Sequence, residues 1–144
     1  MNNLFAYGTL RLPEVIEALL GKKLESEPFQ VTNFIRKTMR GQIYPGVIHS
    51  KGAIVDGSLY VGIDDYSMHV LDTFEDEVYE RQLISVNSSI NGIVEAKIYV
   101  VPETHVSILG ENDWNIEEFR AGHLASYVDM CQRFILEQKR KGVI

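Results

Sequence analysis

The chain has 144 residues, of which 45% are hydrophobic and 24% charged, a composition typical of one globular domain that we expect to span residues 1–144. Its net charge of −6 argues against a general nucleic-acid binder, because phosphate contacts need a cationic surface, and no stretch approaches the roughly 20 apolar residues of a membrane span. The single cysteine, Cys131, excludes an internal disulfide and, with no signal peptide recognisable at the N-terminus, favours a cytoplasmic location.

The first half of the chain predicts a short strand, a helix and several further strands. Residues 4–7 are mostly apolar and suit a short buried strand. Residues 13–20 carry apolar side chains at helical spacing, with Pro13 suited to the first turn of a helix and Gly21 to its end. In residues 29–60, β-branched and aromatic residues alternate between glycines, which is typical of strands.

The next part of the chain predicts a second helix and a hairpin. In residues 67–74, apolar side chains recur near helical spacing, and either Asp64 or Asp65 can cap this helix. Residues 79–101 form two apolar runs around an Asn-Gly pair, which is a strong signal for a hairpin turn. Residues 103–113 have no clear pattern, and we expect a loop there.

A long helix is expected over residues 116–139. Asn115 can cap its N-terminus, and Glu118 stands three residues on, in a capping-box relation. The strands are joined mostly by hairpins and do not alternate strictly with helices. We therefore expect an α+β fold, in which a small, mixed and mostly antiparallel sheet curls into a β-barrel flanked by helices.

Several common catalytic motifs are absent from the sequence. It has no phosphate-binding or dinucleotide-binding glycine motif and no nucleophile elbow. Its four histidines are scattered without metal-ligand spacing, so we expect neither a cofactor nor a metal ion. Cys131 lies on the apolar stripe of the last helix, which favours a buried structural thiol over a nucleophile.

An acid-rich segment, residues 72–80, contains five acidic side chains, most of which we expect to be solvated. Glu75 differs, because it directly follows Phe74 at the end of an apolar stripe. It can face solvent like its neighbours, or it can point toward the core or a cavity. A carboxyl group in an apolar cavity has a raised pKa and can exchange protons near neutral pH.

Two separated motifs together resemble one known family. Residues 7–10, Tyr-Gly-Thr-Leu, are similar to the Y-G-[ST]-L signature of the γ-glutamylcyclotransferase-like superfamily, in particular its AIG2-like branch. The segment LDTFEDEVYERQLISV, residues 71–86, resembles the second conserved block of that family. Four further segments agree with the family in order and spacing: RLPEVIEALLG, YPGVI, VDGSLYVGI and DWNIEEFR.

The resemblance implies a fold, a reaction and a set of site residues. The family's fold is a small β-barrel flanked by helices. Its characterised enzymes release 5-oxoproline and an amine from γ-glutamyl compounds, as the α-amine of the substrate attacks its own γ-carbonyl. Glu75 corresponds to the family's essential carboxylate, and the turn that cradles the substrate corresponds to Tyr7, Gly8, Thr9 and Leu10.

The residue types at these positions suit that reaction. A single carboxylate can take a proton from the attacking amine and return one to the leaving amine. Backbone N–H groups of residues 8–10 can stabilise the oxyanion of the tetrahedral intermediate. Gly8 lets the chain turn sharply and lets a ligand approach the backbone closely.

Three further side chains are candidate substrate contacts. Arg81 can bind a substrate carboxylate through a bidentate contact, or it can form a salt bridge with a neighbouring acid. Tyr44 and Tyr99 can line the cavity, or they can be core tyrosines with bonded hydroxyl groups. Asp76 would raise the pKa of Glu75 further if both carboxyl groups pointed inward.

These features lead to two main hypotheses. In the first, the protein is a γ-glutamylcyclotransferase-type acyltransferase that converts a γ-glutamyl amine or γ-glutamyl peptide to 5-oxoproline and a free amine, with Glu75 as general acid and base. In the second, it is a non-catalytic module that binds a small metabolite in the same cavity, and a structural role is a third reading. We expect a small γ-glutamyl molecule as partner, with no nucleic acid and no membrane, while the substrate's identity and the oligomeric state stay open.

Overall fold

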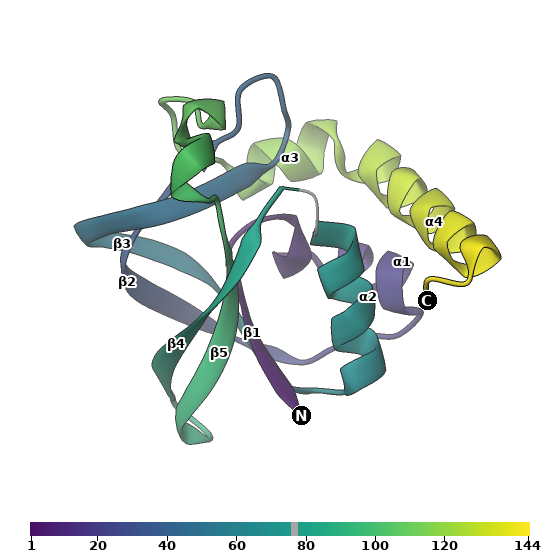
Figure 1. Ribbon diagram of the computed structural model, residues 1–144, viewed down its shortest axis with the longest axis horizontal. Helices are drawn as coiled ribbons and strands as arrows, with labels where there is room; N and C mark the ends of the chain where they lie inside the picture. The colour runs from purple at the N-terminus through teal and green to yellow at the C-terminus, as the bar shows by residue number, and fades with distance from the viewer. Residues whose placement is uncertain (76–77) are drawn as a thin grey trace.

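Five strands form one mixed sheet in the computed structural model, which describes residues 1–75 and 78–144 (Figure 1). In chain order the strands are β1 (Asn2–Ala6), β2 (Ser26–Thr38), β3 (Pro45–Ile63), β4 (Glu80–Ser88) and β5 (Gly92–Val100). Their order in the sheet is β2-β3-β1-β5-β4. β1 runs parallel to β5, and the other neighbouring strands are antiparallel.

The sheet is curved but open. One hydrophobic cluster is built almost entirely from strand residues, with Phe5 and Ile98 fully buried in it. Within the described residues, the edge strands β2 and β4 share no backbone ladder. The hydroxyl groups of Ser88 and Ser89 instead donate hydrogen bonds to the carboxylate of Glu27 on β2. The α+β prediction is confirmed, whereas the expected barrel is only approximate, because side chains rather than backbone pairs bridge its edges.

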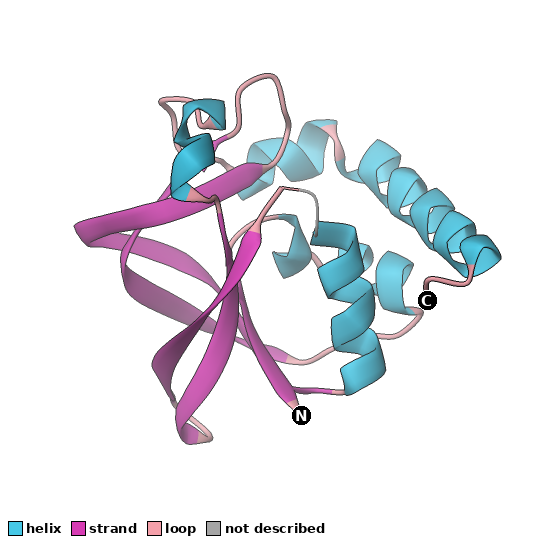
Figure 2. Cartoon of the chain, in the orientation of Figure 1, coloured by secondary structure: helices cyan, strands magenta, loops and turns pink. Residues whose placement is uncertain are grey.

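The helices lie beside the sheet, where they cover the second hydrophobic cluster (Figure 2). They are α1 (Pro13–Leu20), α2 (Asp65–Glu75), α3 (Ile116–Gly122) and α4 (Leu124–Lys141). Their apolar faces pack against Leu4 of β1 and Tyr60 of β3. No helix of the described chain is long and apolar enough to cross a membrane.

Three helix boundaries follow the local sequence signals. Gly21 ends α1 in a left-handed conformation with φ of 70°, as predicted. Asp64 caps α2, because its Oδ1 accepts a hydrogen bond from the N–H of Ser67 at 2.8 Å. The N-cap of α3 is Asn115, whose Oδ1 accepts from the N–H groups of Glu117 and Glu118, so this cap is also confirmed.

The single helix expected over residues 116–139 is two helices. The break falls at His123, whose φ of −133° and ψ of −11° are not helical. Gly122 directly precedes it, and glycine destabilises a helix interior by about 1 kcal/mol relative to alanine. The chain changes direction there, so that α4 crosses beside α1 and α2 (Figure 1).

Two short 3₁₀ helices complete the fold. The loop expected at residues 103–113 contains η2 (Glu103–Ile108), so that prediction is wrong for its first half. η1 (Thr9–Arg11) follows β1 almost directly and overlaps the end of the first sequence motif. The strand expected at residues 4–7 therefore ends at Ala6, and Tyr7 and Gly8 connect β1 to η1.

Candidate functional site

A cavity of about 640 Å³ lies where the C-terminal end of β1 meets α2 and α4. All the site residues predicted from the sequence except Arg81 line this cavity: Tyr7, Gly8, Thr9, Leu10, Tyr44, Glu75 and Tyr99. Its size lies in the range of about 300–1,000 Å³ that is usual for small-molecule sites. The fold thus brings the two sequence motifs together in one ligand-sized space.

The turn between β1 and η1 presents backbone donors at the cavity. The carbonyl groups of Gly8 and Thr9 accept hydrogen bonds from the N–H groups of Arg11 and Leu12, at 3.0 and 3.1 Å, which close η1. The N–H groups of Gly8, Thr9 and Leu10 donate to no acceptor among the described residues. The first N–H groups of a helical turn have no partner inside that turn, so these three are available to a ligand.

Gly8 is required by close packing. A Cβ atom at this position would lie 2.9 Å from Cγ of Pro45, which begins β3. The carbonyl of Pro45 accepts a hydrogen bond of 2.5 Å from the hydroxyl of Tyr79, which holds the facing wall in place. Glycine therefore allows β3 to approach the turn directly. Its φ of −128° is not positive, so close packing is the reason that the structure gives for glycine at this position.

Tyrosine side chains form much of the cavity wall, and most of their hydroxyl groups are already bonded. Tyr7 donates to the carbonyl of Tyr99 at 2.6 Å, and Tyr99 donates to Oδ1 of Asp72 at 2.7 Å. The hydroxyl groups of Tyr127 and Thr9 share a hydrogen bond of 3.2 Å. The half-buried Tyr44 makes no hydrogen bond through its hydroxyl to any described residue. It is therefore the tyrosine of this wall best placed to donate to a ligand.

Glu75 ends α2 and enters the cavity as a carboxyl group without a charged partner. No described residue forms an ion pair or a side-chain hydrogen bond with it. Burial raises its pKa to about 8, because a desolvated carboxylate is less stable than the neutral acid. Glu75 in turn raises the pKa values of the surrounding tyrosines Tyr44 and Tyr127, in addition to the effect of their own burial.

The sequence suggests that Asp76 could raise the pKa of Glu75 further, but Asp76 lies outside the described residues. Burial accounts for the pKa shift of Glu75. The cavity therefore holds an acid that can exchange a proton near neutral pH.

Arg81 lies apart from the cavity. Its guanidinium group forms a salt bridge and hydrogen bond with Asp72, and its side chain is 44% exposed. Of the two roles that the sequence leaves open, this arrangement corresponds to the salt bridge with a neighbouring acid. Asp72 also accepts the hydrogen bond from Tyr99, the residue opposite Arg81 in the pairing of β4 with β5, so Arg81 lies behind this part of the cavity wall and is not one of the residues that line it.

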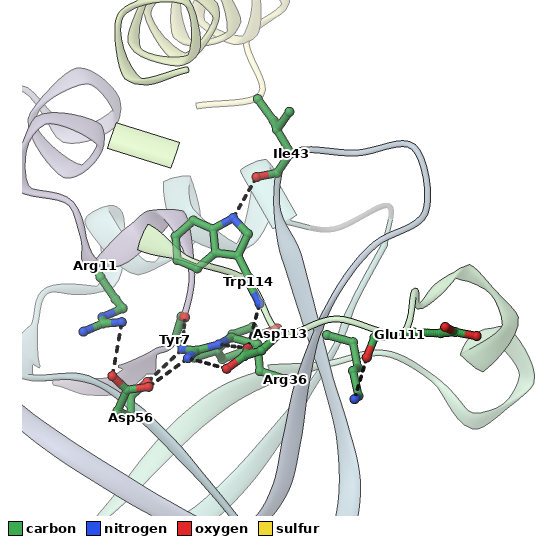
Figure 3. A network of polar contacts seen from close by, with 9 residues as sticks. Tyr7, Arg11, Arg36, Ile43, Asp56, Glu111, Asp113 and Trp114 are labelled. Carbon is green, nitrogen blue, oxygen red and sulfur yellow. Dashed lines mark hydrogen bonds and ion pairs between the residues drawn. The ribbon is translucent and has the colours of Figure 1, made fainter. Parts of the chain in front are cut away.

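A buried arginine behind the turn was not identified from the sequence. Arg36 on β2 donates to the carbonyl of Tyr7 at 2.9 Å through Nη1. It also pairs with Asp113 through Nε and with Asp56 through Nη2, both at 2.8 Å (Figure 3). Its side chain is only 8% exposed. The available signal was its spacing of two from the buried Phe34, which places both residues on the inner face of a strand.

The same network fixes the segment before α3. Asp113 Oδ1 accepts a hydrogen bond from the N–H of Trp114 at 2.7 Å, and Trp114 Nε1 donates to the carbonyl of Ile43 at 2.8 Å (Figure 3). Trp114 is buried and packs against Phe119. It therefore anchors the C-terminal helices, while Arg36 connects the same segment to the turn.

Among the described residues, the structure offers neither a metal site nor a reactive thiol. No cluster of three or more His, Cys, Asp or Glu side chains within residues 1–75 and 78–144 could hold a metal ion. Cys131 is buried, and burial raises the pKa of its thiol to about 12, so it is not a nucleophile near neutral pH. Glu75 is therefore the titratable group in the cavity that can act as an acid and a base.

Comparisons with known proteins agree with the geometry. The family model described as "Gamma-glutamyl cyclotransferase, AIG2-like" matches residues 4–116. AIG2-like protein D of Arabidopsis thaliana is 30% identical over 140 residues, which cover 95% of this chain and 91% of that protein.

Solved structures show the same fold. The solution structure of an Arabidopsis thaliana protein has a TM-score of 0.66 at 25% identity and covers 96% of this chain and 84% of that chain. A gamma-glutamyl cyclotransferase has a TM-score of 0.57 at 13% identity, with 91% and 86% of the two chains covered, and this likeness concerns the fold alone.

Proposed function

Since the chain belongs to the AIG2-like family of gamma-glutamyl cyclotransferases, we propose that it converts a γ-glutamyl amine or γ-glutamyl peptide to 5-oxoproline and a free amine. One observation carries the proposal: Glu75, with a pKa of about 8, lines the same cavity as the free N–H groups of the Tyr7–Leu10 turn. General acid–base catalysis works best with a group whose pKa lies near the working pH.

Glu75 is proposed to move protons between the two nitrogens of the substrate. The α-ammonium group binds beside the Glu75 carboxylate, and their attraction lowers the pKa of that carboxyl group on binding. The carboxylate then takes a proton from the ammonium, and the freed amine attacks the γ-carbonyl carbon. As the C–N bond to the leaving amine breaks, Glu75 returns a proton to that nitrogen.

The turn is proposed to stabilise the charge that develops on the γ-carbonyl oxygen. An oxyanion gains most from donors that are already in position before the reaction starts. The N–H groups of Gly8, Thr9 and Leu10 are such donors, since η1 and Arg36 fix the turn without using them. The hydroxyl of Tyr44, which also lines the cavity, is a further donor.

The cavity also contributes through substrate conformation. Ring closure needs the α-amine and the γ-carbonyl carbon of one molecule to be held at close distance. Holding reacting groups in this way can remove several kcal/mol of the activation barrier. The rings of the buried Tyr127 and the half-buried Phe74, which pack edge to face with centroids 6.2 Å apart, are proposed to hold the substrate in such a pose.

The test is release of 5-oxoproline from a panel of γ-glutamyl amines and dipeptides, measured for the wild type and for Glu75→Gln and Glu75→Ala. Removal of the acid–base group is expected to lower kcat/KM by about 10²–10⁴. Glu80→Gln is a matched control, because this exposed carboxylate lies outside the cavity. Full activity in Glu75→Gln would contradict the assigned role. Ligand-dependent thermal stabilisation without any product would indicate a non-catalytic binding module instead.

A further inference from the structure

The cavity has a second end that the glutamyl part of a substrate does not need. Four apolar side chains form it, and we call them the apolar wall: Phe74, Met130, Phe134 and Val143. They come from α2, from α4 and from the chain segment that follows α4. A cavity of about 640 Å³ is of the size that takes drug-sized ligands, so a glutamyl group bound at the turn leaves the space beside this wall for the rest of the substrate.

The apolar wall is held together by aromatic packing between α2 and α4. The rings of Phe74 and Phe134 pack edge to face with centroids 5.2 Å apart, which connects α2 to α4. Phe74 makes a second edge-to-face contact with Tyr127, so the wall continues into the hydrophobic core. Met130 is 36% exposed and lies at the rim of the cavity. An apolar group could enter past Met130 and stack against the Phe74–Phe134 pair.

The cavity lining offers no cationic side chain, within the described residues, that could pair with a second carboxylate of a substrate. No Lys, Arg or His occurs among the described residues that line the cavity, and its polar members near the apolar wall, Thr73 and Gln138, are neutral. The N–H groups of the turn and the hydroxyl of Tyr44 are donors available to the negative oxygens of the glutamyl part. A second carboxylate, as in the amino-acid half of a γ-glutamyl dipeptide, would lie near Glu75 without a counter-charge. Such a group keeps its charge only at a large cost when it leaves water.

We propose that the leaving amine carries an uncharged apolar substituent, aromatic or aliphatic, which binds against the apolar wall. This inference rests on the proposed cyclotransferase activity and narrows its substrate class to γ-glutamyl derivatives of apolar primary amines. The α-amine of the glutamyl group forms the new C–N bond, and the bond between the γ-carbonyl carbon and the apolar amine breaks. The departing nitrogen receives the proton that Glu75 carries, so no further reactant is needed.

The direct test compares two substrates that differ by one carboxylate. These are γ-glutamyl-2-phenylethylamide and γ-glutamylphenylalanine, with γ-glutamylmethylamide as the small reference. We expect kcat/KM for the phenylethylamide to exceed the values for the other two by at least tenfold, because burial of an aromatic ring stabilises binding and an unpaired carboxylate opposes it. Equal values, or a preference for γ-glutamylphenylalanine, would overturn the inference while leaving the cyclotransferase proposal intact.

A variant that adds a positive charge at the rim of the cavity provides a second test. Met130→Lys places an ammonium group at the rim and is expected to raise kcat/KM for γ-glutamylphenylalanine at least fivefold, without a matching gain for the phenylethylamide. Leu136→Lys is the matched control, since it adds the same charge to α4 at a residue that is 67% exposed and outside the cavity. Val143→Lys is a second rim variant at a 44% exposed position, in case the first does not fold. The same gain in the control as in the rim variants would overturn the inference.

Binding measurements separate this inference from the proposed function. Calorimetric titration of Glu75→Gln with the phenylethylamide and with γ-glutamylphenylalanine reports affinity without turnover. If no compound yields 5-oxoproline but the phenylethylamide binds at least tenfold more tightly, the cyclotransferase proposal fails and the specificity of the apolar wall stands. If neither compound binds and neither reacts, both are wrong.

Discussion

Glu75, which is half-buried, and Arg36, which is buried, are ionisable residues near the Tyr7–Leu10 turn, and the fold treats them in opposite ways. Arg36 has two carboxylate partners and donates to two backbone carbonyls, those of Tyr7 and Asp56. Glu75 has no ion-pair partner among the described residues, and its pKa rises to about 8. A buried ionisable group that is fully hydrogen-bonded and ion-paired stays charged and fixes its neighbours. A desolvated carboxyl group without such partners has a raised pKa and can exchange its proton near neutral pH.

The two residues therefore have different roles: Arg36 stabilises the turn, and Glu75 is the proposed acid and base. Arg36 donates a hydrogen bond to the carbonyl of Tyr7 in the turn, and the N–H groups of residues 8–10 have no partner among the described residues. Glu75 lines the cavity that those N–H groups also line. Stability is therefore expected to depend mainly on the first residue, and the pH dependence of activity mainly on the second.

The largest expected effect is on stability, from Arg36→Met. This change removes the donors to the carbonyls of Tyr7 and Asp56 and leaves two carboxylates without their partner, so we expect a loss of about 3 kcal/mol. Denaturant unfolding at pH 7 measures it. Arg133→Met is the matched control, because the ion pair of Arg133 with Asp129 is 72% and 64% exposed and should change stability by less than about 0.5 kcal/mol. An equal loss of unfolding free energy in Arg36→Met and Arg133→Met would show that Arg36 contributes no more to stability than an exposed ion pair does.

The next effect concerns activity and pH. The free enzyme needs Glu75 as a carboxylate to accept the proton of the substrate ammonium, and its pKa is about 8. We therefore expect kcat/KM to rise about fiftyfold between pH 6 and pH 8, since one group must lose its proton. Initial rates of 5-oxoproline release over this range provide the measurement. An acid limb centred near pH 4.5 would show that Glu75 is not the titrating group.

A third effect links the same carboxyl group to stability. Its pKa is about 8 in the folded state and 4.5 as a free side chain, so the folded protein binds more protons between these values and loses stability as the pH rises through them. Below pH 4.5 this cost is absent, and above pH 8 it is complete. At about 1.4 kcal/mol per pKa unit, this shift corresponds to at most about 5 kcal/mol. Because Glu75 is only half-buried and solvent screens part of this cost, Glu75→Gln, which stays neutral, is expected to exceed the wild type in stability by about 2 kcal/mol at pH 9 and to lose this advantage near pH 4.

Denaturant unfolding of Glu75→Gln and the wild type at pH 4, 7 and 9 measures this difference. Glu25→Gln, at an exposed position, is the control for general effects of removing a negative charge. A difference between Glu75→Gln and the wild type that does not change with pH would contradict the assigned burial of the carboxyl group.

The smallest effect is expected at Arg81. Its ion pair with Asp72 is 44% and 30% exposed, and pairs of this kind contribute at most about 1 kcal/mol. Arg81→Ala should leave kcat/KM within about threefold of the wild type, because the guanidinium does not line the cavity. Steady-state kinetics with one γ-glutamyl amine provide the measurement. A loss of 100-fold or more would favour the alternative role, in which Arg81 binds a substrate carboxylate.

Local signals predicted most of the secondary structure because they act within a few residues. Pro13 and Gly21 bound α1 through their own backbone geometry, and Asn115 caps α3 through hydrogen bonds to residues two and three positions on. The signal at Gly122 was also local, but the apolar stripe that continues from Phe119 to Ile135 suggested one helix. Both helices bury residues of this stripe in one cluster, so the stripe predicted the burial correctly and the break incorrectly.

Sequence by itself determined most of the elements, the apolar stripes and, through two motifs, the positions of the turn and Glu75. Only the tertiary structure decided that these lie in one cavity, that Arg81 pairs with Asp72 and that Arg36 supports Tyr7. The physical reason is distance along the chain: caps and periodicity depend on neighbours within a few residues. The pKa of Glu75, the partners of Arg36 and the apolar wall depend on residues that only the folded chain brings into contact.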